Sequence, residues 1–293
     1  MKRTEEAVNK AINGARAETA AAERCRSSRP PNCANFSGAP NENPPDQSQH
    51  HPNHSTTAIA RWPSGCISGT EIIAVTAVRG VPYIATRAEA LLGAAALEMI
   101  ADHQNRADVV IIGAFGDPEL FGARELFDIP VLGMSEASML TACMMGRRFS
   151  IIRFARALHP WYVDCLEMHG LSGRCASVRT LPGSFESITD IQEEKEALLI
   201  ELANAAIEAD AIILSGAPLA GTANKVKDFV PVPLVDPIQS AVKQAEGLFA
   251  LAPRKPTAGT FRRPDPKTTL GLPEPLASRI EHGANSDHES INP

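Results

Sequence analysis

Apolar runs alternate with segments of helical character from about residue 70 to about residue 252. Runs such as ADVVIIGAF at 107–115 are apolar apart from Asp108, which predicts strands buried on both faces. The segments between the runs predict helices over about 87–103, 118–127 and 135–145. Because strands that alternate with helices are typical of βαβ units, the pattern predicts parallel sheets.

The second half of this region repeats the first. ADVVIIGAFG at 107–116 aligns with ADAIILSGAP at 209–218, and IPVLGMSEAS at 129–138 aligns with VPLVDPIQSA at 232–241. Both copies run through the same order of strands, turns and helices. We therefore expect an α/β protein with two related, doubly wound, flavodoxin-like lobes of parallel sheet, pseudo-twofold symmetry and a cleft between the lobes.

The pattern divides the chain into four regions. The first lobe is expected to comprise 70–146 together with about 236–252, and the second lobe 147–235. Residues 1–69 are polar and nearly free of branched aliphatic side chains over much of their length, so we expect a largely disordered N-terminal extension. Residues 253–293 form a polar, Pro-rich tail that we expect either to wrap the surface or to hang free.

Charge and composition narrow the classes of function. A formal net charge of −6 over 293 residues predicts no general affinity for nucleic acid or for anionic membrane surfaces. No apolar run reaches the roughly 18 residues of a membrane helix, and the start lacks the apolar segment of a secretion signal, so we expect a cytoplasmic protein. The six cysteines form no CxxC pair. They are predicted to be reduced thiols, with Cys143 and Cys165 buried on helices.

Two turns that match in the repeat are the predicted ligand-binding edge. GAFGDP at 113–118 and SGAPLAG at 215–221 place small residues where a strand meets a helix. Backbone N–H groups at such turns can bind an anion, although for one turn alone the glycines can simply permit a tight turn. Because the turns match in both halves, we expect one cleft that faces a small anionic or carbonyl-bearing molecule. Neither turn is a GxGxxG or Walker sequence, so a nucleotide is not predicted.

With these motifs in view, the chain from about Thr70 to Leu251 resembles the aspartate/glutamate/hydantoin racemase superfamily, and its hydantoin racemase branch most. The resemblance lies in VVIIGAFGDPELFGARELFDIPVLGMSEASMLTA, GRRFSIIRFARAL, AIILSGAPLAG and VPVPLVDPIQSAVKQAE. It implies an isomerase without a cofactor that racemises a small-molecule substrate at a carbon beside a carbonyl, using two opposed cysteines. It also suggests a homo-oligomer.

The two cysteine positions that the resemblance implies fall at Ala114 and Gly216, and neither side chain carries a proton. The two-thiol mechanism is therefore excluded at these positions, and the catalytic residue stays unassigned. Three functions remain open. The first is a racemase or related isomerase acting at an acidic α-carbon of a hydantoin-like or amino-acid-like molecule. The others are an inactive small-molecule-binding paralogue, and a decarboxylase or lyase that stabilises an enolate in the same cleft.

The start of the first lobe also departs from the resemblance. Family members open with a strand and an Asn-Pro-Asn-Thr-like loop, of which Asn53, Thr56, Thr57 and 58–61 preserve only a faint echo. We expect the leading strand to be missing or altered, which would leave a gap in the first sheet.

The predicted substrate-binding residues lie at the two turns and at neighbouring strand ends: Ala114, Phe115, Gly116, Ser215, Gly216, Ala217, Tyr83, Ser135 and Glu136. Asp117 is a candidate base, but an Asp before Pro118 more often caps a helix. Ser135 is a candidate cap. Ser215 lacks a partnered base and is expected to bind rather than to accept a proton.

Two histidine features have alternative explanations. His159 can reach a cleft from its strand end, but a surface or structural role is commoner. The cluster of His50, His51 and His54 lacks a fourth metal ligand at a suitable spacing, so no metal is predicted, and the resemblance implies no cofactor.

Overall fold

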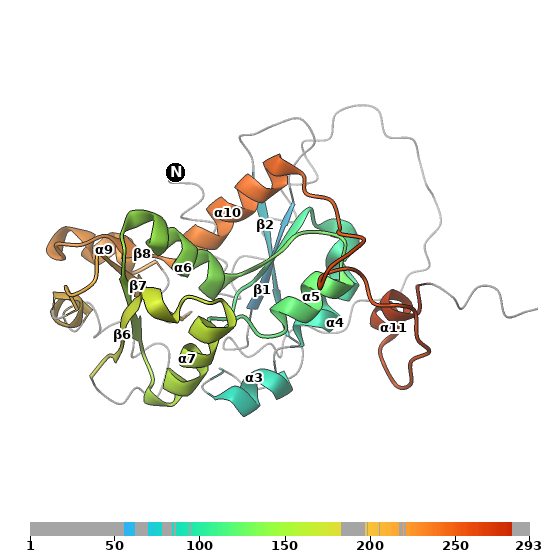
Figure 1. Ribbon diagram of the computed structural model, residues 1–293, viewed down its shortest axis with the longest axis horizontal. Coiled ribbons are helices and arrows are strands. Elements are labelled where there is room, and N and C mark those ends of the chain that lie inside the picture. The colour runs from blue at the N-terminus through green and yellow to red at the C-terminus, as the bar shows by residue number, and fades with distance from the viewer. Residues whose placement is uncertain are drawn as a thin grey trace, which may run out of the picture.

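The computed structural model describes residues 56–61, 70–77, 84, 86–93, 95–182, 197, 199–204, 206–216, 219 and 221–282. These residues form two four-stranded sheets flanked by helices, which lie side by side in Figure 1. The expected α/β class with two lobes is confirmed.

The first sheet has the order β2-β1-β3-β4. Strand β3 (Val109–Ile112) is parallel to β4 (Val131–Gly133), as predicted, whereas β1 (Thr56–Arg61) lies between β2 (Glu71–Thr76) and β3 and is antiparallel to both. The expectation of a gap in this sheet is therefore wrong. Residues that were assigned to the N-terminal extension form this central strand. Pairing along both edges satisfies the backbone groups of β1. Its short, weakly apolar sequence does not by itself predict a strand.

The second sheet has the order β6-β5-β7-β8, and every pairing in it is parallel. Its strands are β5 (Phe149–Arg153), β6 (Cys175–Thr180), β7 (Ala211–Leu214) and β8 (Leu234–Val235). All residues of β5 and β7 are buried, which matches the continuous apolar sequence of β7, whereas β5 also buries Ser150 and Arg153.

Two helices cross between the sheets. Helix α6 (Met134–Met145) follows β4, yet its Met139 and Ala142 pack with residues of β5 and β7. Helix α10 (Pro237–Leu251) follows β8 and packs its Ala241 on β3 and β4. The two helices lie against each other (Figure 1), and the side-chain amide of Gln244 donates to the carbonyl oxygen of Ala137 at 2.7 Å. Each sheet therefore receives a helix from the other half of the chain, as a pseudo-twofold repeat requires.

The remaining helices surround this frame: α3 (Arg87–Gly93), α4 (Ala96–His103), α5 (Leu120–Leu126), α7 (His159–Met168), α9 (Ala223–Val226) and α11 (Glu274–Glu281). The prediction of a single helix over 87–103 is wrong, because the helix is interrupted at Ala95, whose φ is 43°. The new N-terminus is capped from elsewhere in the fold: the Leu97 N–H donates to a carboxylate oxygen of Glu119 at 2.8 Å.

The C-terminal segment follows the surface of the first lobe as far as residue 282. The Lys255 ammonium donates to the carbonyl oxygens of Glu125 and Phe127, at 2.8 and 2.9 Å, where α5 ends. The Arg279 guanidinium lies 5.6 Å from the centre of the Phe127 ring and donates to Asp128 at 2.8 Å. These contacts fix α11 on the first lobe.

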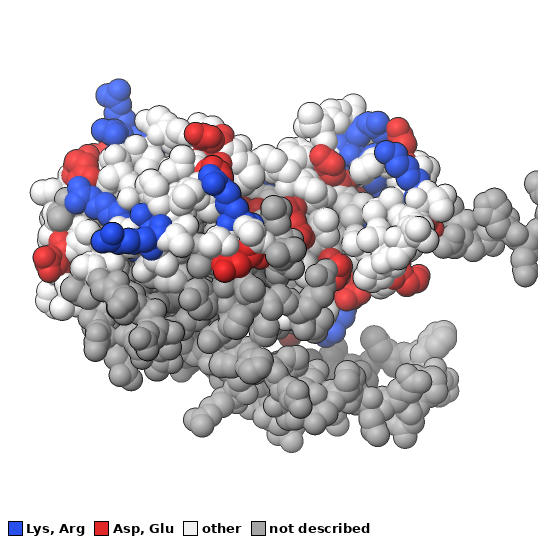
Figure 2. All heavy atoms as spheres, turned by 90° about the horizontal axis from the view of Figure 1, so that it is seen from below, with Lys and Arg blue, Asp and Glu red and all other residues white. Residues whose placement is uncertain are grey.

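Acidic and basic side chains are interspersed over the described part of the face in Figure 2. Among the described helices, none is long and apolar enough to cross a membrane.

Candidate functional site

The first matching turn follows β3 and is held by close packing. Gly116 has a φ of +121°, and a Cβ there would lie 2.3 Å from a ring carbon of Trp161, so only glycine fits. The Gly116 N–H donates to the Ser135 hydroxyl oxygen. Ala114 is half-buried, whereas Phe115 is 5% exposed and its ring centre lies 4.7 Å from that of Tyr162.

The buried carboxylate of Asp117 joins this turn to the start of α6. Its two oxygens accept from the backbone N–H groups of Ser135 and Glu136, each at 2.8 Å, and one also accepts from His169 Nε2 at 3.0 Å. Gly133 leaves room for the carboxylate, since a Cβ there would lie 2.2 Å from Asp117 Cγ. Asp117 therefore caps a helix, but the helix is α6 and not the one that follows it in sequence. Ser135, the residue predicted to cap α6, instead accepts from Gly116.

Glu136 is held in an ion pair. Arg124 Nη1 donates to Glu136 Oε1 at 3.0 Å, Nη2 contacts the other carboxylate oxygen, and Arg124 Nε donates to the Val131 carbonyl oxygen at 2.9 Å. His169 Nδ1 lies 3.6 Å from Glu136 Oε1. A chain of charged and polar groups thus runs from Asp117 through His169 to Arg124.

The Cys165 thiol lies beside this chain of polar groups. The ligand atoms of Cys165, Asp117 and His169 lie within 4.8 Å of one another, a spacing that suits a metal ion, although Asp117 and His169 already bond to each other. Burial, with the Asp117 charge adding to it, raises the pKa of the Cys165 thiol well above its usual value. At neutral pH this thiol is therefore a poor base. Cys165 is buried as predicted, but Cys143 is only half-buried.

The second matching turn follows β7. The Ser215 N–H and hydroxyl both donate to the Ile152 carbonyl oxygen, at 2.8 and 2.7 Å, and Ser215 is fully buried. Gly216 has a φ of +91°, in the region that favours glycine. The Asp236 carboxylate accepts from the Gly221 N–H at 2.5 Å and from the Ile238 N–H at 3.0 Å. This carboxylate caps α10 and fastens the end of the turn to it.

Helix α7 bridges the two turns. Trp161 covers Gly116, while the next residue, Tyr162, contacts the Phe115 ring and lies near enough to Ser215 for the two hydroxyl groups to interact. Burial raises the pKa of Tyr162, so its hydroxyl stays protonated at neutral pH. The structure thus brings Phe115, Gly116 and Ser215 together around adjacent residues of one helix.

The other predicted residues divide into two groups. Glu136 and Ser135 lie next to the first turn through Asp117 and Gly116, as described above. Tyr83 and Ala217 lie outside the described residues. Whether any of the predicted residues contacts a substrate stays a prediction.

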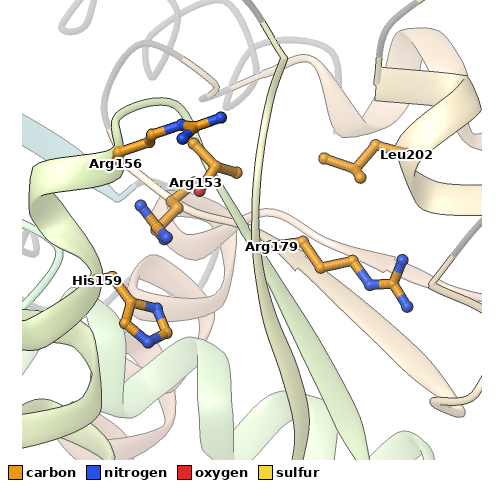
Figure 3. Close-up of a pocket in the computed structure, with 6 residues that line it drawn as sticks. Arg153, Arg156, His159, Arg179 and Leu202 are labelled. Carbon is orange, nitrogen blue, oxygen red and sulfur yellow. The ribbon is translucent and has the colours of Figure 1, made fainter.

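A pocket of about 510 Å³ opens at the carboxyl ends of β5 and β6 (Figure 3). Its lining is rich in basic side chains: Arg153, Arg156, His159, Arg179, Thr180 and Leu202. Sequence reasoning found only His159 among them. A partial signal for Arg153 was available, because it is a cationic residue that ends FSIIR, a mostly apolar strand.

Comparison with known proteins gives concordant results. The family model for Asp/Glu/Hydantoin racemase matches residues 54–245. A hydantoin racemase of Pseudomonas sp. (strain NS671) is 28% identical over 229 residues, which cover 75% of this chain and 88% of that protein. The hydantoin racemase of Paenarthrobacter aurescens is 31% identical over 212 residues, 69% of this chain and 89% of that protein. Among solved structures, allantoin racemase from Klebsiella pneumoniae aligns with a TM-score of 0.66 and 30% identity, over 71% of this chain and 87% of its own.

Proposed function

We propose that this chain, which belongs to the Asp/Glu/hydantoin racemase family, acts on a small hydantoin-like or amino-acid-like molecule at a carbon made acidic by a neighbouring carbonyl group. A racemase-like function follows from the family match, which spans both turns. One observation supports placing the activity at this site: the two turns lie at the carboxyl ends of β3 and β7, and Tyr162 contacts both of them. Ligands of open α/β sheets bind at that edge.

The chemistry at this site divides between stabilising an enolate and moving a proton. Backbone amides of the two turns can stabilise the enolate oxygen that forms when the α-proton leaves. Ala114 and Gly216, however, offer no proton carrier. Since a positioned acid or base contributes about 10²- to 10⁴-fold, we expect exchange to be slower than at a site with two thiols.

Hydrogen exchange in deuterated water tests the proposal. The protein is incubated with a panel of 5-substituted hydantoins, allantoin and acidic amino acids, and α-proton loss is followed by NMR. We expect exchange above the protein-free rate for at least one compound. Absence of exchange across the panel, with protein shown to be folded by circular dichroism, would rule out racemisation.

A second candidate function is ligand binding without turnover. The observation that favours it is the lack of a proton carrier at both Ala114 and Gly216. It predicts that a compound of the panel raises the melting temperature while its α-proton does not exchange.

Reintroduced thiols separate the two candidates further. The double variant Ala114→Cys, Gly216→Cys is compared with the double serine variant, which is similar in size but supplies a poor base. Racemisation by the cysteine variant alone would show that the scaffold can support the chemistry and that the natural chain lacks only the proton carriers.

A further inference from the structure

The pocket at the carboxyl ends of β5 and β6 contains a buried cation that pairs with no carboxylate of the described residues. Arg153 is 7% exposed, and its Nε has no hydrogen-bond partner among the described residues. Its Nη1 donates to the Ala155 carbonyl oxygen at 2.5 Å. Burying an unpaired guanidinium is costly, and proteins ordinarily pair such a group with an anion.

A second positive charge lies close to the first. In Figure 3 the guanidinium groups of Arg153 and Arg156 lie together on one side of the strand, with His159 below them. Burial lowers the pKa of Arg153, and the like charge of Arg156 acts in the same direction. Within the described part of the chain no carboxylate pairs with either group, whereas Arg179 on the other side of the strand pairs with Glu208 at 2.8 Å.

The second matching turn is joined directly to this pocket. Arg153 follows Ile152, whose carbonyl oxygen accepts both hydrogen bonds from Ser215. Tyr162, which interacts with Ser215, also interacts electrostatically with Arg153. An anion held by Arg153 would therefore lie beside the turn that is proposed to hold the reacting part of the substrate.

We infer that Arg153 and Arg156 bind a carboxylate carried by the small molecule on which the protein acts. This inference rests on the proposed function and narrows its substrate class to acidic hydantoin-like or amino-acid-like compounds. Guanidinium groups are suited to the task because their planar donors match the geometry of a carboxylate. Thr180 and His159 line the same pocket and can add donors from its walls.

A matched pair of ligands tests the inference by calorimetry. Hydantoin-5-acetate carries the carboxylate, and hydantoin-5-acetamide has nearly the same shape without the charge. We expect the acetate to bind at least about tenfold more tightly, which corresponds to about 1.4 kcal/mol. Equal affinities would overturn the inference. So would inorganic phosphate binding as tightly as the acetate, because the site would then recognise a free oxyanion and not a substrate carboxylate.

Substitutions connect the preference to the two arginines. Arg156 is exposed, so Arg156→Gln should fold normally, weaken acetate binding by about five- to tenfold and weaken acetamide binding by a smaller factor. Arg254→Gln, at an exposed arginine of the C-terminal segment, is the matched control and should change neither affinity. An Arg156 variant that behaves like the control would contradict the assignment.

Arg153→Met distinguishes a ligand-binding role from a structural one. Because the variant replaces an unpaired buried charge with an apolar side chain, we expect its urea midpoint not to fall and its preference for acetate to disappear. A large fall in the midpoint would show that the fold itself requires the charge, which would overturn the inference.

The exchange assay on the same two ligands keeps the inference separate from the proposed function. Tighter acetate binding without α-proton exchange would remove the catalytic proposal and keep the carboxylate site. Exchange at equal rates with equal affinities would keep the catalytic proposal and remove the site.

Discussion

The carboxylate of Asp117 is expected to be the strongest single anchor of the first turn, and Asp117→Ala tests this. The change removes the acceptor for two backbone N–H groups at the start of α6 and for His169, all in a region where Asp117 is only 2% exposed. Loss of a helix cap costs about 0.5–2 kcal/mol, and each buried donor left unpaired costs about 1–3 kcal/mol. Allowing for partial relaxation, we expect a loss of about 3–5 kcal/mol in the free energy of unfolding.

The asparagine variant separates hydrogen bonding from charge. Asp117→Asn keeps one acceptor oxygen but directs an NH₂ group toward donors, so we expect an intermediate loss of about 1–3 kcal/mol. Urea unfolding followed by circular dichroism measures both variants, with the slope checked for constancy. Asp265→Ala is the control, because Asp265 is exposed and its pair with Arg262 lies at the surface, where ion pairs contribute little to stability. A loss below about 1 kcal/mol for Asp117→Ala would refute the anchoring role.

Three further predictions concern backbone geometry and pH. Gly116→Ala should destabilise the folded protein by about 2–4 kcal/mol, because the new Cβ would clash with Trp161 and the φ of Gly116 is positive. Gly122→Ala on α5 is the control: the nearest atom to its new Cβ would be 3.9 Å away, so it should be neutral or stabilising. The urea midpoints of the two variants are compared. Gly216→Cys should cost about 1–2 kcal/mol of strain at its φ of +91°, measured in the same way. Burial raises the pKa of Cys175 from 9.0 to about 11, so its contribution to stability is complete below pH 9 and is lost as the pH rises through 11. Between pH 8 and 11, the urea midpoint of a Cys175→Ala variant should therefore fall less than that of the unsubstituted protein.

The parts of the fold that were predictable from sequence are those encoded by local apolar pattern. Strands β3 and β7 are continuous apolar runs that need burial on both faces, and their repeat implied two lobes. Strand β1 was not predictable in this way, because its six residues carry few large apolar side chains and it becomes a strand by pairing along both edges.

The site shows the same division between local and long-range information. Gly116 and Asp117 were identifiable from the turn sequence, but the partners of Asp117 are 18, 19 and 52 residues away. Ordinary sequence rules assign an Asp to the helix that follows it, whereas this carboxylate caps a helix reached only after another strand. The Arg153 pocket was missed although the strand FSIIR ends in a cation, because an arginine at a strand end is commonly exposed and the sequence does not show that this one is buried.

The structure changes what the preserved turns mean for function. Both turns keep their other motif residues although Ala114 and Gly216 stand at the two cysteine positions. Asp117 and Asp236 supply a structural reason for the turns to persist, because they fasten the turns to α6 and α10, the helices that each pack on the opposite sheet. Folding alone therefore requires these turns whether or not a proton moves between them. The unpaired charge of Arg153 has no such explanation within the described fold, since burying it opposes folding. Evidence for a retained ligand consequently lies in this arginine, and evidence for retained catalysis must come from α-proton exchange.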